Sequence, residues 1–348
     1  MRRVTGAAMV GAALLLAGCS SSASSTASSS GTTSSANAAA AAPVTVSLGF
    51  QTNITHAPAL IGLKEGFFTK AFGSAATLKA TAFSTGTQET TALLAGQLDA
   101  AYVGPNPAIN TWQKSGGTAI KIVSGAATGG ASVVVTKGIT SAAQLHGKTL
   151  ATPSLGNTQD VALRYWLKQN GLATSATGGG DAFIKPTTPN SAAVLEFKSG
   201  QIAGGSEPAP YDVEMVRDGG TVLVSEPGVT TLLVVTQSFL AAHPAIVEDL
   251  IKAQIQANDF IKSSPAAAQV AANAELAAYT GKALTPGVVA ASFKEITFTN
   301  DPDTASLTSD AAQAVSLGLL KPVNLSGIFD LSPLNQALAA AGESQVSP

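Results

Sequence analysis

The chain has 348 residues, 45% of them hydrophobic, and its 19 basic and 21 acidic side chains give a formal net charge of −2. This composition is typical of a globular protein with a packed core, and the length suggests two domains rather than one. A chain that is not basic is poorly suited to nucleic acid, and a single cysteine excludes a framework of internal disulfides.

The first 18 residues are typical of a secretory signal peptide. Met1-Arg2-Arg3 supplies a positive start, and the apolar stretch over 6–17 is shorter than the roughly 20 residues that a membrane-spanning helix needs. Leu16-Ala17-Gly18-Cys19 resembles a bacterial lipobox. This resemblance implies cleavage before Cys19, lipid attachment to Cys19 and a protein anchored at the outer face of the cell membrane. The alternative is an ordinary signal peptide that ends near a free thiol.

Residues 19–43 are rich in Ser, Ala and Thr and carry no charge. Such a segment cannot bury enough apolar surface to offset the entropy of ordering, so we predict a disordered tether. Without Arg2 and Arg3 the mature chain has 17 basic and 21 acidic side chains, which is a net charge near −4. Its only arginines are Arg164 and Arg217, so a site that clamps an anion with several arginines is excluded.

Strands alternate with helices in the first part of the folded region. The period-2 pattern of Val44–Phe50 predicts a strand. Pro58 suits the first turn of a following helix, which would carry Leu60, Leu63 and Phe67 on one face. The next predicted elements are a strand over 78–83, a helix from the capping-box spacing Thr85 to Gln88 as far as Gly96, and a strand over 98–103.

A similar unit returns about a hundred residues later, with a strand over 150–152, a helix that opens at 157 and a helix over 191–197. Gly96-Gln97-Leu98-Asp99-Ala100 and Gly104-Pro105-Asn106-Pro107 have counterparts in Gly200-Gln201-Ile202-Ala203-Gly204 and Glu207-Pro208-Ala209-Pro210. This recurrence predicts two lobes of like architecture.

Two continuous apolar runs, 132–136 and 231–236, suit strands that are buried on both faces and link the lobes. We therefore expect residues 44–130 in lobe 1, residues 131–231 in lobe 2, and residues 232–348 back in lobe 1, with helices from Pro244 onward. The predicted fold class is α/β, with two lobes, each a mainly parallel sheet flanked by helices, and two hinge crossovers.

Neutral polar side chains follow the predicted strands at the points where helices begin. Ligands of open α/β sheets bind at these strand ends, and helix N-termini attract anions without a charged side chain. Each such residue could instead be only a cap or a turn former. No histidines cluster, so neither a metal nor another cofactor is predicted. The predicted ligand-binding residues are Gln51, Asn53, His56, Thr85, Gly86, Thr87, Asn106, Asn157, Thr158, Gln159 and Glu207.

Thr55-His56-Ala57-Pro58-Ala59-Leu60 resembles the opening of the ABC-transporter substrate-binding proteins for aliphatic sulfonates, taurine and nitrate. The resemblance extends over about 44–340 and implies a periplasmic-binding-protein type II fold. Such a fold closes on a small solute, here expected to be anionic, and docks to a membrane permease. Many relatives have Glu-Pro-Trp at Glu207-Pro208-Ala209, so the resemblance also implies a reshaped pocket here. Further matching blocks are 65–68, 94–99, 104–108, 147–153, 155–160 and 329–331.

The function predicted from the sequence is a lipid-anchored, monomeric solute-binding component of an ABC importer, without catalysis. Two alternatives remain: an extracytoplasmic α/β hydrolase, and a ligand-sensing lipoprotein that is not coupled to transport. The sequence has no Gly-x-Ser-x-Gly elbow and no Ser-x-x-Lys motif. A catalytic triad assembled from distant residues stays open at this point.

Overall fold

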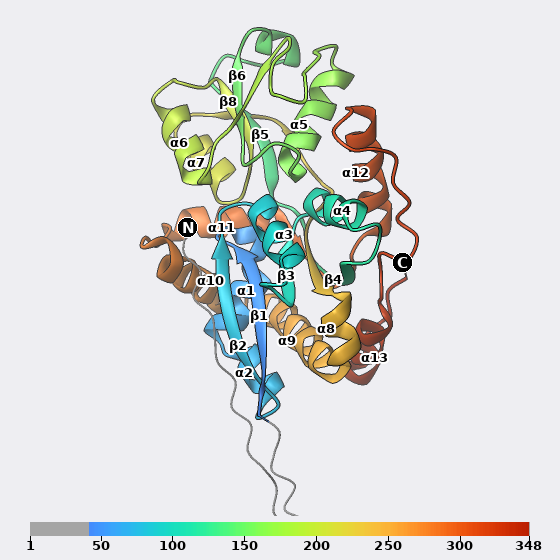
Figure 1. The fold of residues 1–348 in the computed structure, drawn as a ribbon. Coiled ribbons are helices and arrows are strands. Elements are labelled where there is room, and N and C mark those ends of the chain that lie inside the picture. Colours follow the sequence, from blue (N-terminus) through green and yellow to red (C-terminus); the bar gives the residue numbers. More distant parts are fainter. Residues whose placement is uncertain (1–41, 348) are drawn as a thin grey trace, which may run out of the picture. The chain divides into compact units, whose positions relative to one another are not determined.

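Two β-sheets organise residues 42–347, the part of the chain that this computed structural model describes. One sheet has six strands in the order β11-β4-β10-β3-β1-β2, and the other has five in the order β7-β6-β8-β5-β9. We call the six-stranded sheet with its helices lobe 1 and the five-stranded sheet with its helices lobe 2 (Figure 1). The strands are β1 (Val44–Gln51), β2 (Ala76–Phe83), β3 (Ala100–Val103), β4 (Ile120–Gly129), β5 (Ala131–Val135), β6 (Thr149–Thr152), β7 (Phe183–Pro186), β8 (Gly204–Pro208), β9 (Thr221–Ser225), β10 (Val229–Thr236) and β11 (Ile296–Phe298).

Parallel pairing is confined to part of each sheet. β1 pairs in parallel with β2 and β3, and β6 with β7 and β8, whereas the other neighbours are antiparallel. The predicted α/β class with two helix-flanked sheets is confirmed. The expectation of mainly parallel sheets needs correction. β10 runs back from lobe 2 into lobe 1 and therefore lies antiparallel to β3 and β4. In lobe 2, β5 likewise lies antiparallel to both of its neighbours, β8 and β9.

The chain passes between the two sheets twice. β4 leads into β5 through Gly130, and β9 leads into β10 through Glu226-Pro227-Gly228. Gly130 has φ 73°, and a Cβ there would lie 2.3 Å from the Cγ1 of Ile296, so only glycine fits. The apolar runs 132–136 and 231–236 lie largely within β5 and β10, and each of these strands belongs to one sheet. The links between the sheets are therefore shorter than those two runs.

Glycine also sets a helix boundary near the start of the fold. α1 ends at Lys64 and α2 begins at Phe67, because Gly66 adopts a left-handed conformation with φ 70°. Leu60 and Phe67 therefore lie on two helices, not on one as expected. The helices are α1 (Ala57–Lys64), α2 (Phe67–Phe72), α3 (Gly86–Leu94), α4 (Pro105–Lys114), α5 (Thr158–Gln169), α6 (Asn190–Lys198), α7 (Tyr211–Arg217), α8 (Gln237–Ala242), α9 (Pro244–Ser263), α10 (Pro265–Thr280), α11 (Pro286–Lys294), α12 (Thr304–Ser316) and α13 (Ser332–Ala341), with short 3-10 turns η1 (Ile54–His56) and η2 (Ala142–Leu145).

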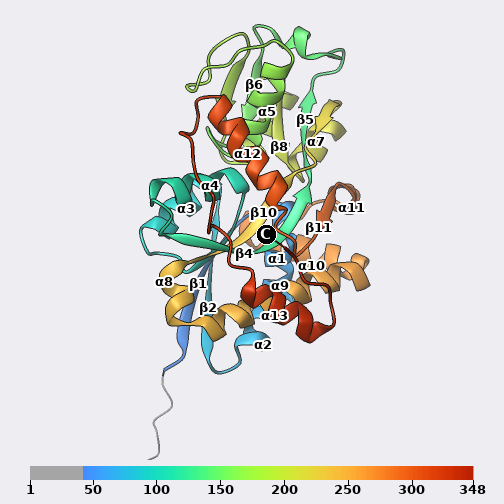
Figure 2. The same ribbon diagram turned by 90° about the vertical axis from the view of Figure 1, so that its right-hand side faces the viewer.

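Helices cover both faces of each sheet (Figures 1 and 2). In lobe 1, one apolar cluster joins the sheet to α1, α2, α9, α10 and α13, and a second joins it to α3, α4 and α12. In lobe 2, α5 covers one face, and α6 and α7 cover the other. Figure 2 shows α12 extending beside α5, where Lys168 Nζ donates to the carbonyl of Ser316 at 2.7 Å. α12 thus connects lobe 1 to lobe 2.

The signal peptide over 1–18, the lipid site Cys19 and nearly all of the tether over 19–43 lie outside the described residues. Within residues 42–347, no helix combines the length and the apolar character needed to span a bilayer.

Candidate functional site

Strand ends and helix N-termini from both lobes meet around a small cleft. α3 and α4 begin at the end of lobe 1 that faces lobe 2, and α5 begins just after β6 of lobe 2 (Figure 1). The space left in the cleft is about 20 Å³. The residues that line it, called the cleft site below, are Gln51, Asn53, Thr55, His56, Gly86, Gly104, Pro107, Pro153, Asn157, Thr158, Gln159, Pro208 and Thr230.

The structure brings together predicted residues from three separate segments of the chain. One group follows β1, one residue opens α3, and one group opens α5. Each segment joins a strand to a helix, which is why the polar side chains of all three face the same gap. The predicted residues that line the cleft are Gln51, Asn53, His56, Gly86, Asn157, Thr158 and Gln159.

The two predicted threonines of the α3 start do not line the cleft. Thr85 is the N-cap, and its Oγ1 accepts from the backbone N of Gln88 at 3.3 Å. Thr87 is exposed, and its Oγ1 lies 3.4 Å from the Oγ of Ser154 in lobe 2. Thr85 therefore stabilises the helix start, while Thr87 contacts the opposite lobe at the edge of the cleft.

Asn106 and Glu207 also lie away from the cleft lining. Asn106 is buried, and its Nδ2 donates to the carbonyl of Asp310 on α12 at 3.4 Å. Glu207 is fully buried, and neither carboxyl oxygen has a hydrogen-bond partner among the described residues. Burial raises the pKa of Glu207 well above its usual value, and the charges of Asp212 and Glu226 raise it further.

The sequence reasoning missed the lining residues Thr55, Gly104, Pro107, Pro153, Pro208 and Thr230. Gly104 and Pro107 flank the predicted Asn106, and Thr230 directly precedes the apolar run 231–236. The prolines and Gly104 could have been predicted to line the cleft from their position at the junction of a strand and the following helix. Thr230 had no such signal, because its strand enters the cleft from the hinge side.

Ala209 is the position at which the sequence resemblance leads us to expect a tryptophan in many relatives. It is fully buried in the first apolar cluster of lobe 1, and its carbonyl accepts from the backbone N of Ile54 at 2.8 Å. This position thus packs against the loop after β1, next to the cleft residue Pro208.

His56 is held as a neutral hydrogen-bond donor. Its Nδ1 accepts from the backbone N of Gln51 at 3.2 Å, so the proton of the neutral ring resides on Nε2. Burial lowers the pKa of His56 to about 3. The ring therefore offers an uncharged N–H at neutral pH.

The side-chain amides of Asn53 and Gln159 both have their oxygen atoms bound within the protein. Asn53 Oδ1 accepts from Thr55 Oγ1 at 2.7 Å, and Gln159 Oε1 accepts from Asn157 Nδ2 at 2.9 Å. Their carbonyl oxygens are engaged within the protein, so Asn53 Nδ2 and Gln159 Nε2 are the atoms left to meet a ligand. Both are donors.

In the part of the chain that the structure describes, no Lys, Arg, Asp or Glu lines the cleft site, so its lining carries no fixed charge. Gln51 Nε2 donates at 3.2 Å to Glu89, whose carboxyl group is fully buried. Burial raises the pKa of Glu89 well above its usual value, and the bond from Gln51 opposes this shift, so the neutral acid is favoured. With N–H donors and the positive ends of α3, α4 and α5 around it, the cleft suits a ligand that is rich in acceptors or anionic.

The buried His56 ring should make stability depend on pH. Its pKa is about 3 in the folded protein and about 6.5 in the unfolded chain, so between pH 3 and pH 6.5 the unfolded chain binds more protons than the folded protein. Stability from this group is therefore lost as pH falls below about 6.5. Relative to His56→Gln, the wild type should lose up to about 1.4 kcal/mol per pH unit between pH 6.5 and 4. Urea unfolding of both proteins across this range measures the difference. Parallel stability curves would contradict a neutral buried ring.

A two-lobed α/β fold with two crossovers and a polar cleft between the lobes is the periplasmic-binding-protein type II fold. An alkanesulfonate-binding protein from Xanthomonas axonopodis pv. citri, solved with MOPS, matches with TM-score 0.70 and 19% identity over 84% of this chain and 99% of the other. The nitrate-binding protein of Synechocystis PCC 6803 matches with TM-score 0.73 and 16% identity over 86% and 89%. A DszB mutant solved with biphenyl-2-sulfinic acid matches with TM-score 0.60 and 16% identity over 85% and 99%.

The chain belongs to the NMT1-like family, whose model matches residues 39–277. A search of curated protein sequences gave no match. The predicted resemblance in fold to sulfonate- and nitrate-binding proteins is thus confirmed. At these identities the solved structures establish the fold alone.

Proposed function

We propose that this protein is the extracytoplasmic solute-binding component of an ABC importer and captures a small anionic solute of the sulfonate or nitrate type. The observation that carries this proposal is the cleft between the lobes, where uncharged donors and three helix N-termini converge without a basic side chain. The alkanesulfonate- and nitrate-binding proteins of the same fold support the choice of solute.

Contacts across the cleft support a mechanism of lobe closure. Ile54 N donates to the carbonyl of Ala209 at 2.8 Å, and Tyr211 OH donates to the carbonyl of Thr52 at 2.9 Å. Both bonds join the loop after β1 in lobe 1 to the end of β8 or the start of α7 in lobe 2. A solute that contacts both lobes would favour closure of the lobes around it. A permease that recognises the closed surface would then bind only the loaded protein.

The direct test is a thermal-shift screen of the protein without residues 1–18 against sulfonates, nitrate, phosphonates and pyrimidine-type vitamins. At one hundred times its Kd, a ligand should stabilise the fold by about 2.7 kcal/mol. It should also compact the molecule in small-angle scattering. A tight ligand that leaves the scattering unchanged would contradict closure.

The donors of the cleft are tested by titrating the identified ligand into Asn53→Leu and Gln159→Leu. Each should lose about 1–3 kcal/mol of binding, the usual range for a hydrogen bond to a charged group. Gln201→Leu is the matched control, because Gln201 is exposed in a loop away from the cleft site. Unchanged affinity in both cleft variants would place the solute elsewhere.

The side chains of the cleft site give little support to the alternative function, an α/β hydrolase. His56 is the histidine of the cleft site, and its Nδ1 is already engaged by the backbone. A pKa of about 3 makes it a weak base near neutral pH. No described contact favours the sensing alternative over transport, and a neighbouring permease and ATPase would distinguish these two.

We further propose that Cys19 carries lipid and holds the protein, as a monomer, at the outer face of the cell membrane. The lipobox resemblance and the uncharged segment after it support this proposal. Cys19→Ala should release the protein from the membrane fraction, which fractionation and immunoblotting would measure. Wild-type membrane retention of that variant would contradict the anchor.

A further inference from the structure

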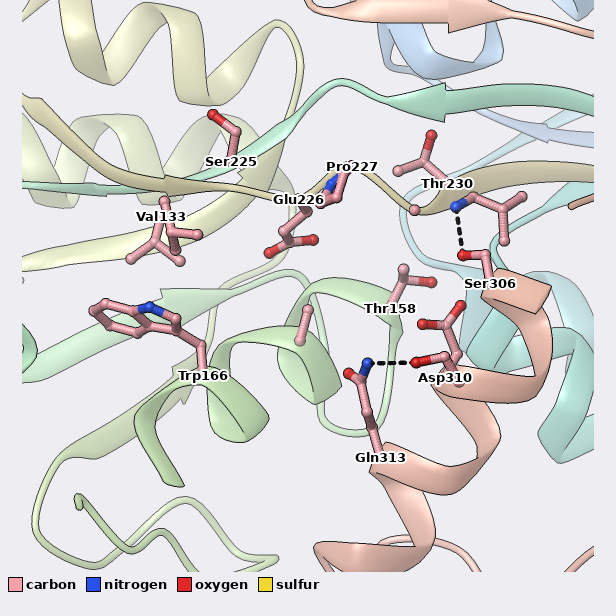
Figure 3. Close-up of a pocket in the computed structure, with 15 residues that line it drawn as sticks. Val133, Thr158, Trp166, Ser225, Glu226, Pro227, Thr230, Ser306, Asp310 and Gln313 are labelled. Atoms are coloured by element: carbon pink, nitrogen blue, oxygen red, sulfur yellow. Dashed lines mark hydrogen bonds between the residues drawn. The ribbon is translucent and has the colours of Figure 1, made fainter. Parts of the chain in front are cut away.

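A second cavity lies beside the crossover Glu226-Pro227-Gly228, between α5 of lobe 2 and α12 of lobe 1 (Figure 3). We call it the hinge cavity. Its volume is about 320 Å³, against about 20 Å³ in the cleft. Thr158 and Thr230 line both spaces, so the hinge cavity lies next to the cleft. The hinge cavity is large enough for a small organic molecule.

Two carboxyl groups are directed into this cavity, as Figure 3 shows for Glu226 of the crossover and Asp310 of α12. Glu226 Oε1 accepts from Ser206 Oγ at 2.5 Å. Asp310 Oδ2 is buried and has no hydrogen-bond partner among the described residues. The cavity therefore contains an acceptor that the protein itself leaves unsatisfied.

Among residues 42–347, the two acids also lack a positive partner, because no Lys, Arg or His of that range lines the cavity. Burial raises the pKa of Glu226 to about 8, and the nearby charge of Asp310 contributes to this rise. Burial raises the pKa of Asp310 to about 7, with a contribution from Asp303. Ionised carboxylates in such a place are costly without a cation. A bound cation would relieve this cost.

The remaining walls suit an organic cation rather than a bare ion. Trp166 of α5 lies on the lobe 2 side and supplies an indole, the best aromatic partner for ammonium and guanidinium groups (Figure 3). Gln313 Nε2 donates to Ser309 Oγ at 3.1 Å, so the carbonyl oxygen of Gln313 is left as an acceptor. Among the described residues, no group of three or more His, Cys, Asp or Glu side chains is arranged to hold a metal ion.

We propose that the hinge cavity is a second ligand site, which binds a small organic ammonium or guanidinium compound between Trp166, Glu226 and Asp310. Trp166 belongs to lobe 2, Asp310 to lobe 1 and Glu226 to the crossover, so the bound cation contacts every part that moves in lobe closure. Its binding favours the arrangement in which these three side chains are close. The proposal does not depend on which solute the cleft takes.

The test is isothermal titration of the protein without residues 1–18 with n-butylamine, 1,4-diaminobutane and tetramethylammonium, with n-butanol as the neutral probe. At constant ionic strength, at least one cation should give saturable binding, and n-butanol should give none. Affinity should rise from pH 6 to pH 8.5, because the two carboxyl groups ionise over that range while the alkylamines stay protonated.

Asp310→Asn and Glu226→Gln should each weaken binding at least tenfold, and Trp166→Leu at least threefold. Asp218→Asn, which alters the ion pair of Asp218 with Lys198, is the matched control and should leave affinity unchanged. If Glu226→Gln fails to fold, Asp310→Asn alone decides. Equal binding of n-butanol and the amines, or wild-type affinity in Asp310→Asn, would overturn the proposal. So would the absence of saturable binding for all three cations.

Discussion

Replacing Arg164 by methionine is expected to lower the free energy of unfolding by about 3–5 kcal/mol, the usual cost of breaking a buried ion pair. Arg164 Nε lies 2.8 Å from Asp160 Oδ2, and the two side chains are 1% and 0% exposed. Asp160 also accepts from the backbone N of Gly156 at 2.8 Å. Removing the guanidinium leaves a buried carboxylate without its cation at the start of α5, beside the cleft residues that this helix carries.

Urea unfolding of Arg164→Met measures this loss, and Lys198→Met is its matched control. Lys198 pairs with Asp218 at 3.2 Å, but 64% of its side chain is exposed, so its loss should cost about 0–1 kcal/mol. The double variant Asp160→Asn/Arg164→Met should recover part of the stability, because the unpaired charge is removed. Similar losses in Arg164→Met and Lys198→Met would contradict the argument from burial.

Replacing Gly104 by valine is expected to weaken binding of the cleft solute about tenfold or more while leaving each lobe folded. Gly104 has φ −69° and ψ 159°, which any residue adopts without strain. A Cβ there would lie 2.5 Å from Thr158 Oγ1 of lobe 2. The added side chain would therefore act as a wedge between the lobes and oppose the closed state.

Scattering in the presence of the solute should show compaction of the wild type but not of Gly104→Val. Gly104→Val/Thr158→Ala should recover compaction, because the colliding oxygen is removed. Gly287→Val is the control, since a Cβ at Gly287 would meet nothing within 4 Å. Normal compaction of Gly104→Val would show that the lobes do not close through this contact.

Much of the fold follows from signals that act over a few residues. Thr85 and Asn157 cap α3 and α5 through bonds to backbone N atoms three residues on, at 3.3 Å and 2.9 Å. Gly66 ends a helix because of its own left-handed backbone. Such effects depend on side chains within one helical turn, so pattern and spacing predict them.

β4 shows where local patterns fail. Its sequence, Ile-Lys-Ile-Val-Ser-Gly-Ala-Ala-Thr-Gly, contains small residues that are not typical of a strand, so the pattern does not predict one there. Nevertheless β4 lies between β10 and β11 in the sheet. A Cβ on Gly125 would lie 2.0 Å from the carbonyl oxygen of Asp301, so this glycine lets a distant segment approach closely. Packing against that segment, rather than intrinsic propensity, explains the strand.

The residues of the two sites also fall into those that the sequence predicts and those that only the structure shows. The sequence by itself determined that Gln51, Asn53, His56, Thr158 and Gln159 stand where strands give way to helices, and the topology then directs them toward one cleft. Only the tertiary structure decided that Gly104 meets Thr158, that Thr230 lines the cleft, and that Glu226 and Asp310 share a cavity. Gly104 and Thr158 are 54 positions apart in the sequence, and Glu226 and Asp310 are 84 positions apart. Whether such residues meet depends on how the whole chain places the two lobes. Sequence spacing carries no direct information on that placement.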